Sequence, residues 1–213
     1  MSNITISFAT TVWNEHEELG RLLNQLTSII GPDDEIVIQG DQGKVTDQVV
    51  SVLHRYRKNP QVKYIEYPLK KNFAAYKNNL FKNCEKDYIV NIDADELLSD
   101  ELAFILRESI GMNPDVDMFR LPRINIVDGL TNEYVRRMNW RVNGQSWVNW
   151  PDYQCRIVKN TGKIKWINPV HEVLAGFEST ADFPENIDYA VLHVKSIDRQ
   201  VKQNDFYSTF QGQ

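Results

Sequence analysis

Apolar and polar positions in the first half of the chain alternate between two periods, one typical of strands and the other typical of helices. Short apolar runs with the composition of buried strands occupy residues 4–9, 35–38, 62–67 and 88–92. Apolar residues recur at helical spacing in the segments that follow these runs, at 19–30, 45–56, 73–84 and 102–110. Strands separated by helices of this length predict a parallel sheet with right-handed crossovers.

The second half carries mainly strand-like segments, at 118–122, 154–158, 163–167 and 189–194. An aromatic and basic stretch, 132–151, lies between the first two of them. We therefore predict one α/β domain built on a Rossmann-like, mostly parallel central sheet flanked by helices. Residues 1–112 would form the helix-flanked half, and residues 113–213 a smaller, β-rich half of the same domain.

Polar residues follow three of the predicted strands, at 10–15, 41–43 and 93–96. In open α/β sheets, ligands bind beyond the carboxyl ends of the strands, near a switch in strand order. The sequence therefore predicts a ligand site at the edge of the sheet where these segments meet.

Composition excludes several classes of protein and compartment. The 213 residues carry a net charge of −5, so no overall positive field would attract nucleic acid or anionic lipid. Cys84 and Cys155, the two cysteines, have no metal-binding spacing and read as reduced thiols. The start of the chain has neither a signal-peptide pattern nor a membrane span. We expect a cytoplasmic protein without an integral membrane segment.

Two carboxylates, Asp93 and Asp95, directly follow the apolar run at 88–92. Residues two apart in extended backbone point to the same side, so both carboxylates can converge on one point. Such a pair would repel unless a cation or a proton neutralised it. Oxygen ligands favour Mg²⁺ or Mn²⁺ over zinc. The alternative is a solvated turn that also caps the helical pattern beginning near Ser99.

The first predicted strand lacks the glycine-rich loop of known nucleotide folds. The chain contains neither GxGxxG after that strand nor GxxxxGK[ST], which disfavours Rossmann dinucleotide binding and P-loop phosphate binding. The strand instead runs into Thr10, Thr11, Trp13 and Glu15, which offer hydroxyls, an aromatic face and an acid. These groups can hold a nucleoside by stacking and hydrogen bonds. Trp13 could equally be a core residue between sheet and helix.

Several segments resemble family 2 glycosyltransferases of the GT-A fold, namely 7–15, 34–38, 41–43, 72–78 and 88–96. Segments 156–159 and 170–172 resemble the branch that includes lipopolysaccharide-core glucosyltransferases. The chain departs from the family at 39–47, which carries extra residues where the family has a compact turn.

The resemblance implies roles for particular residues. Donor and nucleotide binding would involve Thr10, Thr11, Trp13, Glu15, Asp41, Lys77 and Asp93. Asp93 and Asp95 would be the metal-binding motif, with Asp95 the more direct ligand of Mn²⁺ or Mg²⁺. Many enzymes of this fold recruit a histidine near the C-terminus as a further ligand, which implies His193.

An inverting transferase also needs a base that faces the acceptor hydroxyl. Glu172 is the candidate, beside His171 in a segment that follows the turn at 168–169. A surface acid beside a hydrogen-bonded loop histidine is an equally good interpretation of the pair. The predicted reaction is the transfer of a sugar from a nucleoside diphosphate, with UDP the expected carrier, to an acceptor hydroxyl.

Aromatic and basic residues crowd the stretch 132–151, where Trp140, Trp147, Trp150 and Arg141 are candidates for acceptor binding, together with His171. Aromatic faces stack on sugars, and guanidinium groups bind phosphates. Anchoring of a long loop to the core is the alternative. The acceptor could be a glycan, a lipid-linked sugar or another hydroxyl-bearing molecule, with a modified nucleic acid not excluded.

Three other functions use similar motifs. A nucleotidyltransferase shares the sheet and the acids but carries a glycine-rich loop that 12–18 lacks. A haloacid-dehalogenase-type phosphatase places its acidic motif after the first strand, whereas here it follows the fourth. A non-catalytic sugar-nucleotide-binding module remains the non-enzyme alternative. The sequence does not select the sugar, the base, the acceptor or the oligomeric state.

Overall fold

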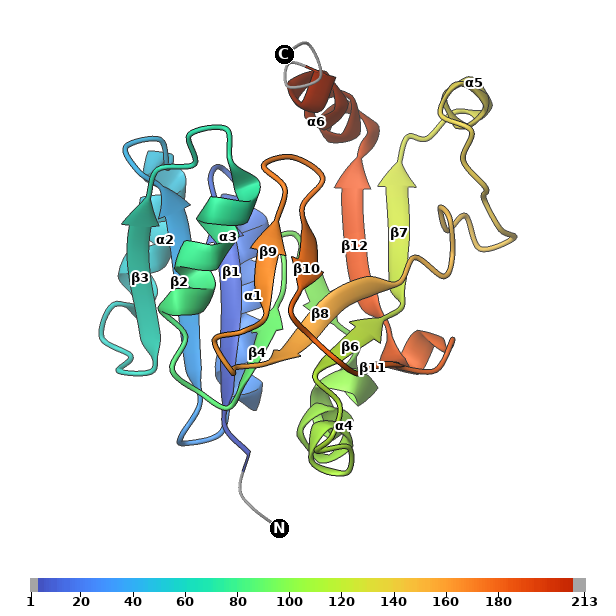
Figure 1. The fold of residues 1–213 in the computed structure, drawn as a ribbon. Coiled ribbons are helices and arrows are strands. Elements are labelled where there is room, and N and C mark those ends of the chain that lie inside the picture. Colours follow the sequence, from blue (N-terminus) through green and yellow to red (C-terminus); the bar gives the residue numbers. More distant parts are fainter. Residues whose placement is uncertain (1–3, 209–213) are drawn as a thin grey trace.

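The computed structural model describes residues 4–208, and a seven-stranded sheet forms its centre (Figure 1). The strand order is β11-β6-β8-β4-β1-β2-β3. The first half supplies the parallel strands β1 (Ile6–Val12), β2 (Glu35–Asp41), β3 (Val62–Tyr67) and β4 (Tyr88–Asn91). The apolar runs of the sequence predicted all four, and the mixed, mostly parallel sheet confirms the predicted fold class.

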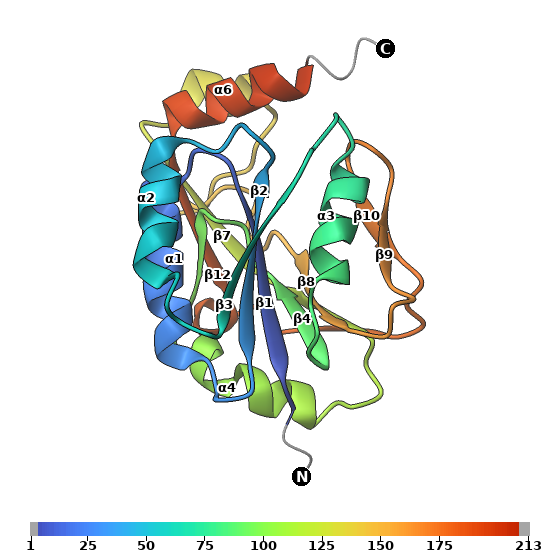
Figure 2. The same ribbon diagram turned by 90° about the vertical axis from the view of Figure 1, so that its left-hand side faces the viewer.

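Helices cover both faces of this sheet, as Figure 2 shows. One face carries α1 (His16–Ile29) and α2 (Asp47–Tyr56), and the other carries α3 (Phe73–Lys82). A hairpin of β9 (Lys165–Ile167) and β10 (Val173–Ala175) packs beside α3. The N-caps Thr46 and Asn72 accept hydrogen bonds from backbone N–H groups in the first turns of α2 and α3.

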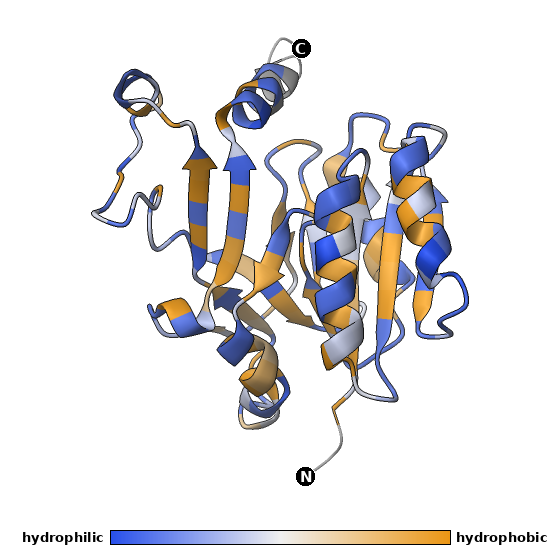
Figure 3. Ribbon diagram, turned by 180° about the vertical axis from the view of Figure 1, so that it is seen from behind, coloured by the Kyte–Doolittle hydropathy of each residue, from blue (hydrophilic) through white to orange (hydrophobic). Residues whose placement is uncertain are grey.

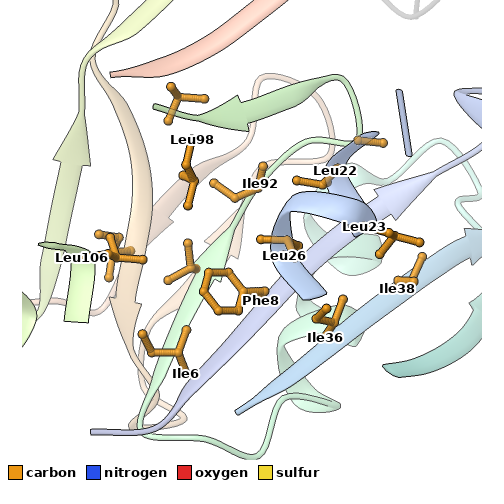
Figure 4. Close-up of a cluster of buried hydrophobic side chains, with 14 of the residues drawn as sticks. Ile6, Phe8, Leu22, Leu23, Leu26, Ile36, Ile38, Ile92, Leu98 and Leu106 are labelled. Atoms are coloured by element: carbon orange, nitrogen blue, oxygen red, sulfur yellow. The ribbon is translucent and has the colours of Figure 1, made fainter. Parts of the chain in front are cut away.

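The core follows from the alternation along the strands. In β1, Ile6 and Phe8 point toward α1, whose leucines share one face of the helix (Figure 4). Ala9, the residue after Phe8, points to the opposite face of the sheet and belongs to a second buried cluster beneath α3. Burying each large aliphatic side chain contributes about 1.5–3 kcal/mol, so these two clusters hold the helices on the sheet. Hydrophobic stripes on the strands and polar outer faces on the helices are visible in Figure 3.

The second half completes the large sheet and adds a smaller one. Strands β6 (Met118–Leu121), β8 (Gln154–Lys159) and β11 (Thr180–Asp182) extend the large sheet beyond β4. The smaller sheet has the order β5-β12-β7, with the strands β5 (Glu96–Leu98), β12 (Val191–Ser196) and β7 (Arg123–Asp128). Because β8 pairs antiparallel with β4, the two predicted halves share one continuous sheet.

The remaining elements are α4 (Asp100–Gly111), α5 (Asn132–Arg137), the 3-10 turn η1 (Ile187–Tyr189) and α6 (Ile197–Ser208). The sequence pattern predicted α4 but none of β5, β7, β10, β11, α5 and α6. Three of these strands have only three residues, too few for a period to register. Within residues 4–208, no helix has the length and apolar character needed to cross a membrane.

Candidate functional site

Three polar segments predicted to meet at one edge of the sheet follow neighbouring parallel strands. The strands β4, β1 and β2 are adjacent and run in the same direction, so their carboxyl ends lie together, at the top of Figure 1. Helix α6 lies across the same end, as Figure 2 shows. Side chains from α6 and from the small sheet therefore also reach this edge.

Asp93 is held by a buried arginine of β8. Arg156 Nη2 donates to Asp93 Oδ2 over 2.6 Å, and the same nitrogen bonds Glu96. Glu96 also accepts from Arg123 Nη1 over 3.0 Å, and it is completely buried. Burial alone would raise the pKa of Asp93, but the Arg156 charge outweighs it and holds that pKa well below its usual range. An internal cation therefore neutralises Asp93.

Asp95 faces His193 instead. His193 Nε2 lies 3.2 Å from Asp95 Oδ2, and Nδ1 lies 2.8 Å from Asn125 Oδ1. Strand pairing explains the meeting, because His193 lies opposite Glu96 of β5 and opposite Asn125 of β7. Burial raises the pKa of Asp95, while the hydrogen bond and charge of His193 lower it, and the net direction is downward.

Asp95 and His193 are the side chains at this edge that could hold a divalent cation. Residues 4–208 contain no group of three or more His, Cys, Asp and Glu side chains able to hold a metal ion. Asp93 is turned to Arg156, which leaves the Asp95 carboxylate and the His193 imidazole as adjacent ligands. Mg²⁺ is usually bound through one or two carboxylates together with substrate phosphates, so this pair fits an ion that arrives with a diphosphate.

The loop after β1 is shaped by Glu15. Its Oε2 accepts from the backbone N–H groups of Trp13 and Asn14, over 2.8 and 3.0 Å. Trp13 is 48 % exposed, so it is not a core residue. Thr10 is buried, and within the described residues its hydroxyl has no hydrogen-bond partner. Thr11 is half-buried in β1. Because about half of Trp13 is exposed, the interpretation of Trp13 as a core side chain is wrong.

Asp41, the candidate for base recognition, links two loops at the end of β2. Its Oδ1 accepts from the backbone N–H of Leu69 over 2.9 Å, and its Oδ2 pairs with Lys44 over 3.0 Å. Both carboxylate oxygens thus already have partners. Lys44 belongs to the segment 39–47 that departs from the family pattern, and its contact with Asp41 closes that turn.

Glu172 and Lys77 form an ion pair, with Lys77 Nζ 2.6 Å from Glu172 Oε1. Lys77 Nζ also lies 4.4 Å from the centroid of the Trp166 ring. Helix α3 and the β9–β10 hairpin thus bring together a predicted donor residue and the predicted base. His171 precedes Glu172 with a positive φ of 55°, which turns the backbone at this point. The role of Glu172 as a base stays a prediction.

The aromatic stretch is held together by its own side chains. Trp147 and Trp150 meet edge to face with centroids 5.2 Å apart, and Trp140 packs in the same way on Tyr134 of α5. All three tryptophans are half-buried, whereas Arg141 is exposed. The tryptophans therefore anchor the loop and also keep part of their surface accessible.

Helix α6 brings a residue that the sequence pattern did not indicate. Arg199 pairs with Glu15 over 3.2 Å and with Glu18 of α1, and lies 3.7 Å from Asp95 Oδ2. Arg156 was equally unexpected, although a charged residue inside an apolar strand such as 154–158 is a signal of a buried ion pair.

The model of one protein family matches most of this chain. The model of the family described as Glycosyl transferase family 2 matches residues 7–164. The chain belongs to glycosyl transferase family 2. This membership confirms the resemblance at the level of the family, while the lipopolysaccharide-core branch stays a prediction. It also favours a glycosyltransferase over the nucleotidyltransferase and the phosphatase.

Two proteins similar to this chain are a curated relative and a solved structure. A poly-beta-1,6-N-acetyl-D-glucosamine synthase of Staphylococcus epidermidis is 27 % identical over 109 residues, 51 % of this chain and 26 % of that protein. The chain thus matches about a quarter of the length of this curated relative. S. aureus TarS residues 1–349 superpose with a TM-score of 0.62 at 14 % identity, covering 90 % of this chain and 60 % of that one.

TarS has also been solved with nucleotides. Its complex with UDP gives a TM-score of 0.62 at 15 % identity, and the complex with UDP-GlcNAc gives 0.56 at 14 %. The first covers 90 % of this chain and 60 % of that chain, and the second covers 86 % and 60 %. At these identities the superpositions establish the shared GT-A-like fold.

Proposed function

We propose that this family 2 domain is a metal-dependent, inverting glycosyltransferase that moves a sugar from a UDP-sugar to an acceptor hydroxyl. The observation that carries the proposal is the Asp95–His193 pair at the carboxyl edge of the sheet, the edge at which the half-exposed Trp13 also lies. A divalent cation bound there would act as a Lewis acid on the departing diphosphate.

Individual residues would bind the donor, hold the cation and accept the proton of the acceptor. Trp13 offers a stacking face for the nucleoside base, and Asp95 with His193 would hold the cation. Lys77, on α3, carries a positive charge that lowers the pKa of Asp93, and this charge would act on the donor phosphates. Glu172 would accept the proton of the acceptor hydroxyl while the oxygen of that hydroxyl attacks the sugar carbon from the side opposite the diphosphate. This role requires Glu172 to exchange its contact with Lys77 for the acceptor.

UDP-N-acetylglucosamine is the first donor to test. The TarS structures contain UDP and UDP-GlcNAc, and the curated relative is named as a synthase of poly-N-acetylglucosamine. The acceptor class remains a glycan, a lipid-linked sugar or another hydroxyl-bearing molecule, and the aromatic stretch with Arg141 is the surface proposed to receive it. We also propose that the protein acts in the cytoplasm and belongs to the branch of the family that includes lipopolysaccharide-core glucosyltransferases.

Calorimetric titration with UDP, GDP and their sugars, with and without Mn²⁺, tests this function. We expect UDP and UDP-N-acetylglucosamine to bind only when Mn²⁺ is present. Asp95→Asn should abolish the metal-dependent part, because it removes a charged ligand. Asp182→Asn is the control, since Asp182 pairs with Arg120 on the surface. If no nucleotide binds with any metal, the proposal is wrong.

Glu172→Gln separates binding from transfer. We expect donor binding to be retained and turnover to fall by about 10²–10⁴, the usual contribution of a positioned general base. Because the substitution also weakens the pair with Lys77, Lys77→Met serves as the comparison and should mainly weaken donor binding. Wild-type turnover in Glu172→Gln, measured as release of UDP, would remove Glu172 from the reaction.

A further inference from the structure

Positive charge is concentrated in the aromatic stretch 132–151. Between Glu133 and Asp152 the chain has three arginines and no acid, although the whole protein has a net charge of −5. Arg136, Arg137 and Arg141 are all exposed. Clustered charges of one sign on a surface attract a ligand of the opposite sign. This stretch is therefore a local positive surface on an acidic protein.

These three arginines differ from the other arginines of the second half. Arg120, Arg123, Arg156 and Arg199 each pair with a carboxylate. Within residues 4–208, no carboxylate is in ion-pair contact with the three arginines of the aromatic stretch. Their guanidinium groups can therefore bind an anionic ligand without first breaking an ion pair.

Arg137 and Trp140 are supported by the same tyrosine. The guanidinium carbon of Arg137 lies 4.6 Å from the centroid of the Tyr134 ring, and the Trp140 ring meets that ring edge to face with centroids 5.5 Å apart. Contact between a guanidinium and a ring face uses none of its five N–H donors. Tyr134 therefore holds a cation and a second aromatic ring close together, and the donors of the cation remain free for a ligand.

Asn149 fixes the backbone of Arg141. The backbone N–H of Arg141 donates to Asn149 Oδ1 over 3.0 Å, and the backbone N–H of Asn149 donates to the Arg141 carbonyl oxygen over 2.8 Å. Trp147 and Trp150, which pack on each other, lie on either side of Asn149 in the sequence. The exposed Arg141 side chain therefore projects from a hydrogen-bonded turn.

Contacts with β7 and α6 hold this surface at the carboxyl edge of the large sheet. Val148 pairs with Asn125 of β7, and Asn204 of α6 donates to the Tyr134 hydroxyl over 2.8 Å. Arg199, which contacts the acids of the candidate site, is five positions before Asn204 on α6. Five residues span about 7.5 Å of an α-helix, so one extended ligand can reach both the arginines and the candidate site. Helices α5 and α6 lie at the same end of the molecule in Figure 1.

We propose that Arg136, Arg137 and Arg141, together with Trp140, form a subsite for an acceptor that carries phosphate groups along its saccharide chain. Guanidinium groups bind phosphate oxygens through paired N–H donors, and indole faces stack on sugar rings. A phosphate-bearing saccharide presents both kinds of group, whereas a neutral glycan would leave three guanidinium groups without a partner. This inference rests on the proposed function and narrows the class of its acceptor.

Nucleic acids and anionic membranes also carry phosphates, but the surface suits them less well. Nucleic-acid binding depends on releasing counterions at many phosphates, and three arginines on a protein of net charge −5 release few. The tryptophans are half-buried against Tyr134 and against each other, so they do not protrude as membrane anchors would. Both ligands are therefore included in the test as competing outcomes.

Affinity electrophoresis through phosphomannan, with unphosphorylated mannan as the comparison, tests the proposal without nucleotide or metal. Retardation is measured against a polymer-free gel, which corrects for differences in protein charge. We expect phosphomannan to retard the wild type far more than mannan does. The triple variant Arg136→Gln, Arg137→Gln and Arg141→Gln should raise the Kd for phosphomannan about tenfold, because three exposed ion pairs with phosphate are lost.

A second triple variant, Arg21→Gln, Arg55→Gln and Arg57→Gln, is the matched control. Arg21 lies on α1, Arg55 lies on α2 and Arg57 directly follows α2, and all three are exposed. The control therefore loses the same charge away from the proposed subsite, and its Kd should stay within about twofold of the wild type. Arg141→Glu, a single charge reversal outside the helices and strands, replaces the first triple variant if that variant does not fold, and should raise the Kd at least about threefold.

The outcomes distinguish this inference from the proposed function. If nucleotide binds but mannan retards the protein as much as phosphomannan, or the two triple variants behave alike, the function is retained and the phosphate subsite is wrong. If phosphomannan binds through the three arginines and no nucleotide binds with any metal, the proposed function fails and the subsite is retained. Vesicles of phosphatidylglycerol and single-stranded DNA complete the test. Arginine-dependent binding to either of them, without binding to phosphomannan, would overturn the assignment of a saccharide ligand.

Discussion

At the scale of single residues, the carboxylates of the acidic motif have different partners. Asp93 and Glu96 are neutralised from inside the protein by Arg156, whereas Asp95 faces His193 and Arg199. The sequence correctly indicated that converging carboxylates need neutralisation. It did not indicate that a guanidinium from β8 supplies it for one of them. The two aspartates are therefore not equivalent, and Asp95 is the more direct candidate for cation binding.

Glu96→Ala should destabilise the protein strongly. Glu96 is completely buried between Arg123 and Arg156, so its removal leaves two buried guanidinium groups short of a counter-charge. Loss of one partner of a buried ion pair costs about 3–5 kcal/mol, and we expect a decrease of this size in the free energy of unfolding in urea.

Asp182→Ala is the control for Glu96→Ala. It breaks the exposed pair with Arg120, which should cost less than about 1 kcal/mol. Equal effects of the two substitutions would contradict the structural role assigned to Glu96.

The pKa of Lys195 should lie well below the ordinary lysine value of 10.5. Burial lowers its pKa to about 8 from the ordinary value of 10.5, although Asp95 and Asp93 act in the opposite direction. A folded pKa below the unfolded one means that the stability associated with neutral Lys195 is lost as the pH falls from 10.5 to about 8. Amine labelling followed by mass spectrometry should show a midpoint near pH 8 for Lys195. A midpoint above 10 would show that the group is solvated.

At the scale of elements, the site is made where strand ends of the large sheet meet the small sheet and α6. The first-half strands and helices were predictable, because their periods extend over six or more residues in most of them. The small sheet was not predicted. Strand β5 has only three residues, and in β7 the alternation of polar and apolar residues covers only its first four positions, 123–126. His193 reaches Asp95 only because β12 lies between β5 and β7.

Arg199→Ala should loosen α6 from the edge of the sheet. Arg199 is 28 % exposed at its side chain and bonds Glu15 and Glu18, so its loss removes the ion pairs between α6 and the loop after β1. A partly exposed set of this kind contributes about 1 kcal/mol, and we expect amide exchange in α6 to rise about fivefold. Lys202→Ala, at an exposed position of the same helix, is the control. Unchanged exchange in Arg199→Ala would show that other contacts, such as the hydrogen bond from Asn204 to the Tyr134 hydroxyl, hold the helix.

At the scale of the whole molecule, the two predicted halves share one sheet. Strand β8 lies between β4 and β6 in the large sheet, and β5 of the first half pairs only with β12 of the second within the described residues. Residue 112 therefore marks a change in the sequence pattern, from alternating strands and helices to mainly strands. Backbone hydrogen bonds between β4 and β8 and between β5 and β12 join the two sides of this boundary.

Residues 1–112 produced alone should therefore fail to unfold cooperatively. The fragment leaves one edge of β4 and both edges of β5 without partners, and exposes apolar residues such as Val90 that the second half covers. We expect a broad, non-cooperative thermal transition by circular dichroism, compared with a single sharp transition of the complete chain. A sharp transition of the fragment would show that the first half is an independent domain.

The sequence by itself determined the α/β class, the four parallel strands, the family motifs and the placement of acids at a strand end, because all of these are written in neighbouring residues. The partners of those acids were decided only by the tertiary structure. Arg156 lies 63 positions from Asp93, and His193 lies 98 positions from Asp95. Such pairings depend on strand order and on how the two sheets pack, and no local period along the chain encodes them.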